Sequence, residues 1–131
     1  MSKSKGSRVE RELVHMFFDN SHAASRIAGS GSTPLLAPDI LAGVNGRVLA
    51  IECKSGKDKR YITKEQIKEL RDFSKKFGAE SWLGVRFDRE GWYFLSLEDL
   101  NKSSTGNNFV VDIELAKKKG LSFEELIKFK Y

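Results

Sequence analysis

The sequence contains few of the residues and motifs that many enzyme classes require. It has one cysteine, Cys53, and two histidines, His15 and His22, among 131 residues. A single cysteine excludes an intrachain disulfide and a cysteine zinc cluster, and the histidine spacing matches no usual metal or catalytic pattern. The Gly-x-Ser-x-Gly elbow of hydrolases, the Walker loop and the Gly-x-Gly-x-x-Gly dinucleotide fingerprint are also absent.

Long apolar segments are absent as well. No apolar run approaches the roughly 18 residues that a membrane span needs. Residues 1–6 are rich in lysine and serine and lack the apolar core of a signal peptide. We therefore expect a cytoplasmic protein without membrane contact, beginning with a flexible basic segment over residues 1–6.

What is present fits one basic domain spanning residues 1–131. Lys and Arg number 23 against 18 Asp and Glu, which gives a net charge of +5, and hydrophobic residues make up 40%, enough for a core. The basic residues gather in two groups, Lys3, Lys5, Arg8 and Arg11 near the start and Lys54, Lys57, Lys59, Arg60 and Lys64 in the middle. Such groups suit a phosphate backbone, although solvated loops and a mobile N-terminus explain them equally well.

Hydrophobic periodicity and turn signals divide the chain into helices and strands. Ser7 and Glu10 predict a capping box at the first helix, and Asn45-Gly46 predicts a tight turn between two antiparallel strands. The expected helices are Ser7–Asn20, Thr63–Phe77 and Ser122–Lys130, and the expected strands are Ala23–Ile27, Ile40–Val44, Val48–Lys54, Ser81–Phe87 and Trp92–Leu95. Residues 101–108 are polar and expected to be mobile. This order predicts an α/β fold, a single domain with a central mixed β-sheet flanked by helices.

The strand Val48–Lys54 has an apolar start and a charged end, which predicts a central strand covered on both faces. Side chains alternate along a strand, so Glu52 and Lys54 share one face. Pairing outward from the Asn45-Gly46 turn brings Asp39 opposite Glu52. Two carboxylates this close favour a cation between them, and oxygen ligands without histidine or cysteine suit Mg²⁺ or Mn²⁺. Without Asp39, the same Glu-x-Lys pattern is that of an ordinary ion pair at the solvent end of a strand.

Glu10 is a third candidate acid. It begins the apolar stripe of the first expected helix and borders its buried face. The capping box with Ser7 competes for this side chain, because one carboxylate cannot bond the helix N-terminus and a metal at once. Both roles stay open at this point.

Aromatic residues are concentrated in the second expected hairpin, at Trp82, Phe87, Trp92, Tyr93 and Phe94. This is more apolar surface than one face of a sheet requires. The hairpin is therefore either a core element covered on both faces, which is the favoured interpretation, or a subunit interface.

Glu10, Pro38-Asp39 and Glu52-Cys53-Lys54 together resemble the nuclease pattern of the restriction-endonuclease-like superfamily. Within it, the chain is similar to the archaeal-type Holliday junction resolvases, and the similar stretches are Gly6–Leu13, Arg26–Ser30, Pro38–Ile40, Ile51–Ser55 and Phe77-Gly78. The resemblance extends from Gly6 to about Leu97. It implies a metal-dependent endonuclease that resolves four-way DNA junctions by paired symmetric nicks in homologous recombination and DNA repair.

The resemblance also implies roles for individual residues. Asp39 and Glu52 would bind Mg²⁺, for which Mn²⁺ substitutes, together with the backbone carbonyl of Cys53. Lys54 would orient or help deprotonate the attacking water and stabilise the charge that develops. Glu10 would be a third acid at or next to the metal.

Phosphate contacts, a catalytic loop and an assembly are implied too. By resemblance, Arg11 and Arg26 would hold phosphates, and the basic groups add Arg8, Lys57, Lys59 and Arg60. Ser30 would lie in a loop that contributes to catalysis, although the loop is long here and Ser32 and Thr33 compete for that role. Two symmetric nicks made by a chain with one site imply a homodimer with two-fold symmetry.

Two other functions remain open, namely a restriction-type or other branched-DNA nuclease with the same metal site, and a basic DNA-binding module without catalysis. Against the restriction enzyme, 131 residues leave no room for a separate recognition domain. Against the binding module, two carboxylates placed at a phosphate would repel DNA. No residue pattern points to a sliding-clamp or helicase partner.

Overall fold

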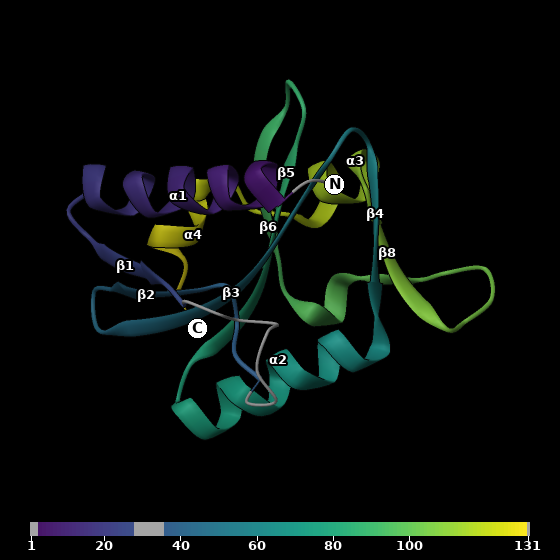
Figure 1. Cartoon of the computed structure of the whole chain (residues 1–131), viewed down its shortest axis with the longest axis horizontal. Coiled ribbons are helices and arrows are strands. Elements are labelled where there is room, and N and C mark those ends of the chain that lie inside the picture. The colour runs from purple at the N-terminus through teal and green to yellow at the C-terminus, as the bar shows by residue number, and fades with distance from the viewer. Residues whose placement is uncertain (1–2, 28–35, 131) are drawn as a thin grey trace.

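The computed structural model describes residues 3–27 and 36–130 (Figure 1). Its helices are α1 (Lys3–Asp19), α2 (Lys64–Phe77), α3 (Ile113–Lys119) and α4 (Phe123–Lys128), with a 3₁₀ turn at Leu97–Asp99. Its strands are β1 (Ala23–Arg26), β2 (Ile40–Val44), β3 (Arg47–Gly56), β4 (Lys59–Thr63), β5 (Glu80–Phe87), β6 (Gly91–Leu95), β7 (Asn101–Lys102) and β8 (Asn108–Asp112).

The main sheet has five strands in the order β1-β2-β3-β5-β6. β3 and β5 run parallel and the other neighbours are antiparallel, so the sheet is mixed as expected. Asn45 and Gly46 both have positive φ, 50° and 84°, and turn β2 directly into β3. This turn pairs Val44 with Arg47 and sets the register of the whole hairpin.

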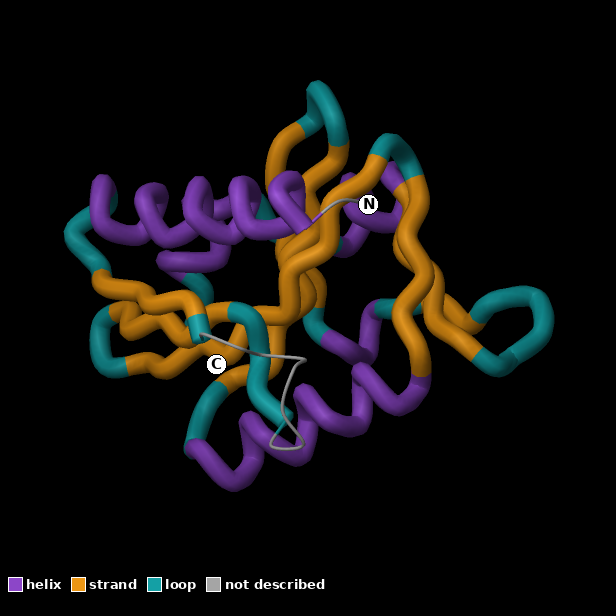
Figure 2. The backbone as a smooth tube through the Cα atoms, viewed as in Figure 1, coloured by secondary structure: helices purple, strands orange, loops and turns teal. Residues whose placement is uncertain are grey.

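Helices cover both faces of this sheet (Figures 1 and 2). On one face, α1 and α4 pack against alternate residues of β3, among them Leu49 and Ile51. On the other face, α2 and α3 pack in the cluster that contains Ala50. Because β3 is buried on both sides, its charged residues Glu52 and Lys54 emerge only toward its end. The predicted single-domain α/β architecture is confirmed.

α2 begins and ends at the residues that the sequence indicates. The Thr63 hydroxyl accepts from the Gln66 N–H at 3.0 Å and the Gln66 Oε1 accepts from the Thr63 N–H at 3.1 Å, which completes a capping box. Gly78 ends the helix in the left-handed region at φ 83°. The equivalent box predicted at Ser122 and Glu125 opens α4.

The predicted start of α1 is wrong. The helix begins at Lys3, so Ser7 and Glu10 lie inside the helix instead of capping it. The flexibility expected of residues 1–6 stays a prediction. Both side chains instead accept hydrogen bonds from Arg26 of β1. The Glu10 carboxylate therefore binds Arg26 of another element and does not cap its own helix.

A second sheet was not predicted at all. It has the order β4-β8-β7 (Figure 2). It is followed by α3, whose N-terminus is capped by Asp112. The stretch 101–108 is therefore not simply a mobile loop, because it contains β7 and the first residue of β8. The sequence signal for this second sheet is weak, because β4 buries only Ile62 and pairs with a strand far along the chain.

The aromatic hairpin belongs to the core. Trp82, Phe87, Trp92 and Phe94 are between 0% and 8% exposed and Tyr93 is half-buried, which confirms the favoured interpretation of a core element. In the described residues, no helix is long and apolar enough to cross a membrane.

Candidate active site

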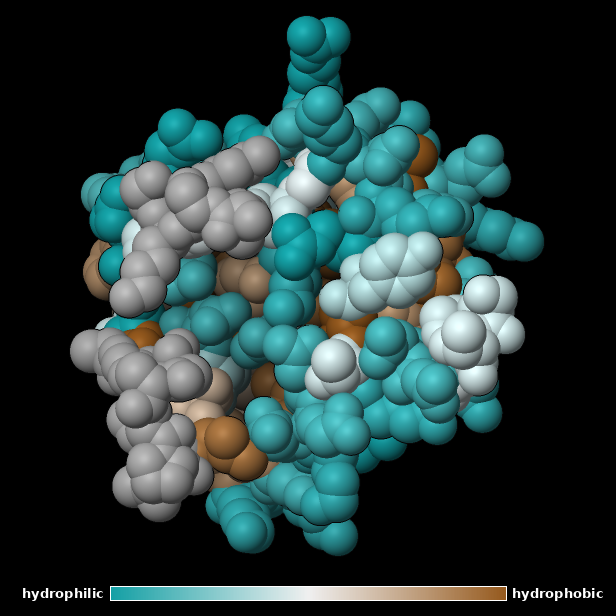
Figure 3. Space-filling model, turned by 45° about the vertical axis from the view of Figure 1, so that its right-hand side comes forward, coloured by the Kyte–Doolittle hydropathy of each residue, from teal (hydrophilic) through white to brown (hydrophobic). Residues whose placement is uncertain are grey.

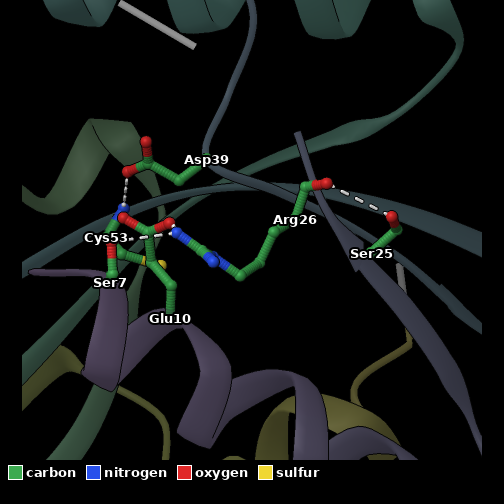
Figure 4. A network of polar contacts seen from close by, with 6 residues as sticks. All are labelled: Ser7, Glu10, Ser25, Arg26, Asp39 and Cys53. Atoms are coloured by element: carbon green, nitrogen blue, oxygen red, sulfur yellow. Dashed lines mark hydrogen bonds and ion pairs between the residues drawn. The ribbon is translucent and has the colours of Figure 1, made fainter. Parts of the chain in front are cut away.

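Asp39 and Glu52 lie where the β2–β3 ladder ends. The last pair is Ile40 with Ile51, so Asp39 follows one step beyond it, at the level of Glu52. The Asp39 Oδ2 accepts a hydrogen bond of 2.8 Å from the Cys53 N–H, which holds the carboxylate against the next residue of β3 (Figure 4). The predicted meeting of the two acids at one end of the hairpin is confirmed.

The two carboxylates line a cavity of about 280 Å³ between the sheet and α2. Sequence reasoning missed the contribution of α2, from which Gln66, Glu69 and Leu70 complete the wall. Gln66 carried a local signal, because its place in the capping box fixes it in the first turn of α2. Glu69 follows it three residues later on the same helix face.

The electrostatics of Glu52 favour a cation. Burial, and then the neighbouring charge of Asp39, raise the pKa of Glu52 to about 8, and Lys54 opposes the shift only in part. Glu10 and Glu69 act in the same direction as Asp39. A carboxylate that is costly to ionise next to another carboxylate is stabilised by a bound cation, so this donor set fits Mg²⁺ or Mn²⁺.

Cys53 faces the core with its side chain and this site with its backbone. Its thiol is buried, and burial followed by the charge of Asp39 raises its pKa well above the usual value, so the sulfur stays protonated. Both backbone polar groups of one strand residue point to the same strand edge. Since the Cys53 N–H meets Asp39, its carbonyl points to that edge too, beyond the last β2–β3 pair.

Lys54 shares the Glu52 face of β3 and is half-buried. Among the described residues it forms no ion pair, and its positive charge acts on Glu52 by lowering the pKa of that carboxyl. The ammonium group is therefore available to a substrate that enters beside the carboxylates.

Glu10 lies near Asp39 and is held by Arg26 (Figure 4). Its Oε1 accepts from the Arg26 Nε at 3.1 Å, and the Ser7 hydroxyl accepts from the Arg26 Nη2 at 3.1 Å. Burial and the charge of Asp39 raise the pKa of Glu10, while Arg26 lowers it. Within residues 3–27 and 36–130, no three acid, histidine or cysteine side chains converge to hold a metal ion. Glu10 is thus adjacent to the site without completing a ligand set.

The basic residues divide into exposed and engaged ones. Arg8 and Arg11 on α1, and Lys57 and Lys59 around the β3–β4 turn, are exposed. Arg60 is half-buried and donates to the Ser55 carbonyl, with its side chain packed over Gly56. Figure 3 brings the β4 side of the molecule forward and shows a mainly hydrophilic face. Arg60 therefore has a structural partner that its predicted role at phosphate did not include.

The loop residue Ser30 and its alternatives Ser32 and Thr33 lie outside the described residues. Their predicted contribution to catalysis stays a prediction.

The whole chain is similar to known proteins of one kind. A family described as archaeal Holliday junction resolvase (Hjc) matches residues 1–131. The crossover junction endodeoxyribonuclease Hjc of Archaeoglobus fulgidus is 38% identical over 132 residues, covering 94% of this chain and 95% of its own. The enzyme of the same name from Methanocaldococcus jannaschii is 39% identical over 124 residues, covering 94% of this chain and 86% of its own.

The fold agrees with a solved structure of such a protein. The structure of Archaeoglobus fulgidus Hjc, described as a Holliday junction resolvase from an archaeal hyperthermophile, matches with a TM-score of 0.84 and 30% identity. The match covers 97% of this chain and 98% of that chain, so it includes the second sheet and the C-terminal helices.

Proposed function

Because the chain belongs to the archaeal Holliday junction resolvase family, we propose that it is an endonuclease that resolves four-way DNA junctions with Mg²⁺ held by Asp39 and Glu52. The observation that carries this proposal is the meeting of these two carboxylates in one cavity, with the pKa of Glu52 raised to about 8. Mn²⁺ has the same preference for oxygen ligands and substitutes for Mg²⁺.

Four groups of the chain would divide the work of hydrolysis. Bound Mg²⁺ supplies activation of the attacking water and neutralises charge on the scissile phosphate. Asp39 and Glu52 would hold the ion, and the Cys53 carbonyl would be a further ligand. Lys54 orients the water and stabilises negative charge where it develops on the phosphate. In-line attack of water breaks the bond to the 3′ oxygen and leaves 5′-phosphate and 3′-hydroxyl ends.

The exposed cations would position the DNA. Arg8 and Arg11 on α1 and Lys57 and Lys59 beside β3 project into solvent. Contacts to phosphates supply affinity that falls with salt and does not depend on base sequence. Such contacts suit an enzyme that selects DNA by shape rather than by sequence.

Two coordinated nicks require two active sites, so we propose a homodimer with two-fold symmetry. With the aromatic hairpin buried, exposed apolar surface remains on α2, where Phe77 is 54% exposed and stacks on Phe73 with ring centroids 5.2 Å apart. With Leu36, these rings line a hollow of about 670 Å³. Acidic and basic side chains surround it, namely Glu65, Lys68, Glu69, Asp72 and Lys76.

This α2 surface suits a second copy of the chain. Mixed charges around an apolar centre can pair with themselves across a two-fold axis. The hollow shares Leu36 and Glu69 with the cavity of the two carboxylates. Contact here would therefore set the spacing between the two active sites, on which selection of junction shape depends.

The test is a cleavage assay on a labelled four-way junction and on a linear duplex of the same sequence. Wild-type protein should nick the junction in paired, symmetric positions in Mg²⁺ or Mn²⁺ and not in EDTA. Asp39→Asn and Glu52→Gln should abolish cutting while junction binding persists. Equal cutting of the duplex would favour a restriction-type nuclease, and binding without cutting in either metal would favour a DNA-binding module.

A further inference from the structure

We propose that Arg26 is an exchangeable counter-ion of Glu10, released when a divalent cation binds at Asp39 and Glu52 and then free to bind a phosphate of the junction. The inference deepens the proposed function and rests on it for the identity of the DNA. It assigns Arg26 one role in the metal-free protein and another in the complex with metal and DNA.

Arg26 connects three parts of the site. It is the last residue of β1, where it pairs with Ile40, and the next N–H, that of Ile27, donates to the Asp39 carbonyl at 3.0 Å. Its guanidinium crosses to α1 and bonds Glu10 and Ser7 (Figure 4). The segment that braces the backbone of Asp39 therefore also supplies the cation that neutralises Glu10.

The Arg26 guanidinium supplies the positive charge that Glu10 needs beside the other acids. The side chain of Glu10 is 19% exposed and is influenced by the charge of Asp39, which raises its pKa. Glu10 in turn acts on Glu52. Acids this close to one another favour a neighbouring positive charge. Among the described residues, Arg26 is the cation in contact with Glu10.

A divalent cation at the other two acids would compete with this contact. It attracts the Glu10 carboxylate and repels the guanidinium, and a Glu10 side chain that turns toward the metal draws its Oε1 away from the Arg26 Nε. The side chain of Arg26 is 37% exposed, so its guanidinium can move to solvent once Glu10 is taken. A released guanidinium at the rim of a nuclease site is matched in shape and charge to a phosphate.

The exchange couples the two ligands. If metal binding frees Arg26 for DNA, then metal tightens junction binding, and junction binding tightens metal binding by the same factor. An arginine that only braces α1 against β1 would produce no such coupling.

The first test measures Mn²⁺ binding without DNA, by the loss of the free-ion EPR signal. Arg26→Gln should bind Mn²⁺ several-fold more tightly than wild type, because the competitor is gone. In a Glu10→Gln background, Arg26→Gln should change the affinity no more than Arg11→Gln does. Arg11 is the matched control, since it acts on Glu10 by charge and makes no hydrogen bond to it. Thermal unfolding of each variant checks that it is folded.

Three results of this titration would overturn the exchange. One is weaker Mn²⁺ binding by Arg26→Gln, which would make the arginine a brace that holds Glu10 for the metal. Another is an equal gain in Mn²⁺ affinity from Arg26→Gln in the wild-type and Glu10→Gln backgrounds. The third is no Mn²⁺ binding by wild type and Arg26→Gln alike.

The second test measures junction binding against salt concentration, in Ca²⁺ and in EDTA, with the junction checked for integrity on the same gels. Arg26→Gln should reduce the slope of log K against log salt by about 1 in Ca²⁺ and leave it unchanged in EDTA. An equal change in both conditions would contradict the exchange. Neither test depends on cleavage, so a protein that shows the exchange but does not cut junctions would refute the proposed function alone.

Discussion

At Glu52, burial and a neighbouring acid act in the same direction. The folded protein holds a proton on this carboxyl up to about pH 8, whereas an unfolded glutamate releases it near its ordinary pKa of 4.5. The folded state therefore binds the proton more tightly than the unfolded state. The free energy that this proton contributes is fully present at low pH and is lost as the pH rises through the folded value.

The metal-free protein should accordingly lose stability between about pH 4.5 and 8. We expect a loss of roughly 2 to 4 kcal/mol from this residue, measured by urea unfolding at pH 5.5, 7 and 8.5 in EDTA. Glu52→Gln should flatten the dependence, and Mg²⁺ should restore stability at the higher pH values because it replaces the proton. Stability that rises over this range in EDTA would contradict the environment assigned to Glu52.

We expect Lys54 to affect the rate of junction cleavage and not the affinity for the metal ion. Lys54→Ala should slow junction cleavage by about 10²- to 10³-fold. This is the usual effect of removing one group that stabilises the charge developing in the transition state. Mn²⁺ affinity should stay within about threefold of wild type, because an ammonium is not a ligand. Lys128→Ala removes an equal charge from α4 and serves as the control. A rate loss explained entirely by weaker metal binding would show that Lys54 only supports the carboxylates.

At the scale of the elements, Arg47 holds three of them together. From the first position of β3 it donates to both oxygens of Glu80 on β5, at 2.8 and 2.9 Å, and to the Leu126 carbonyl of α4 at 2.9 Å. It also lies over the Phe129 ring at 5.8 Å. This network closes the sheet end opposite to the one that carries the carboxylates.

Arg47→Met should therefore destabilise the fold without changing metal binding. The side chain of Glu80 is 13% exposed and would lose both guanidinium bonds. We expect a loss of about 2 to 4 kcal/mol, read from urea unfolding. Adding Glu80→Gln should recover part of the lost stability, because it removes the Glu80 charge that Arg47 no longer neutralises. A loss below about 0.5 kcal/mol, or a shifted Mn²⁺ affinity, would show that the network has another role.

Elements with local signals could be predicted from the sequence, and elements with distant partners could not. α2 was predictable because both of its caps lie within a few residues of its ends, and the β2–β3 hairpin because Asn45-Gly46 sets its register. The same hairpin brought Asp39 to Glu52. β4 was missed because its partner β8 lies about 50 residues further along the chain.

Local signals also misled where a distant residue changed their meaning. Ser7 and Glu10 match a capping box, yet their partner is Arg26, which is 19 residues from Ser7 and 16 from Glu10. The place of Glu69 in the cavity depends on how α2 packs on the sheet, which no spacing within the helix reveals.

At the scale of the whole molecule, the number of active sites decides the product. One chain carries one Asp39–Glu52 pair, and a four-way junction is resolved only when two strands are cut. Contact through the α2 surface would join two sites in one particle. The assembly is therefore as much a part of the proposed function as the carboxylates.

Phe77→Asp should convert the proposed dimer into a monomer with an intact fold. The ring is 54% exposed, so the change costs the monomer little, while it places a charge at the centre of the proposed contact. Sedimentation velocity should report half the wild-type mass at equal concentration. Tyr61→Asp is the control, since Tyr61 is 55% exposed on β4 and does not line the hollow on α2. An unchanged mass for Phe77→Asp, or dissociation by Tyr61→Asp, would place the interface elsewhere.

The most direct test of the account is the product formed from a supercoiled plasmid that extrudes a cruciform, which is a four-way junction. In Mg²⁺ the wild-type protein should convert it directly to linear DNA, because both strands are cut while the dimer is bound. EDTA or Asp39→Asn should leave the plasmid supercoiled. Nicked circles as the lasting product, equal cutting of a plasmid without the cruciform, or linear DNA in EDTA would contradict paired, metal-dependent cleavage at Asp39 and Glu52.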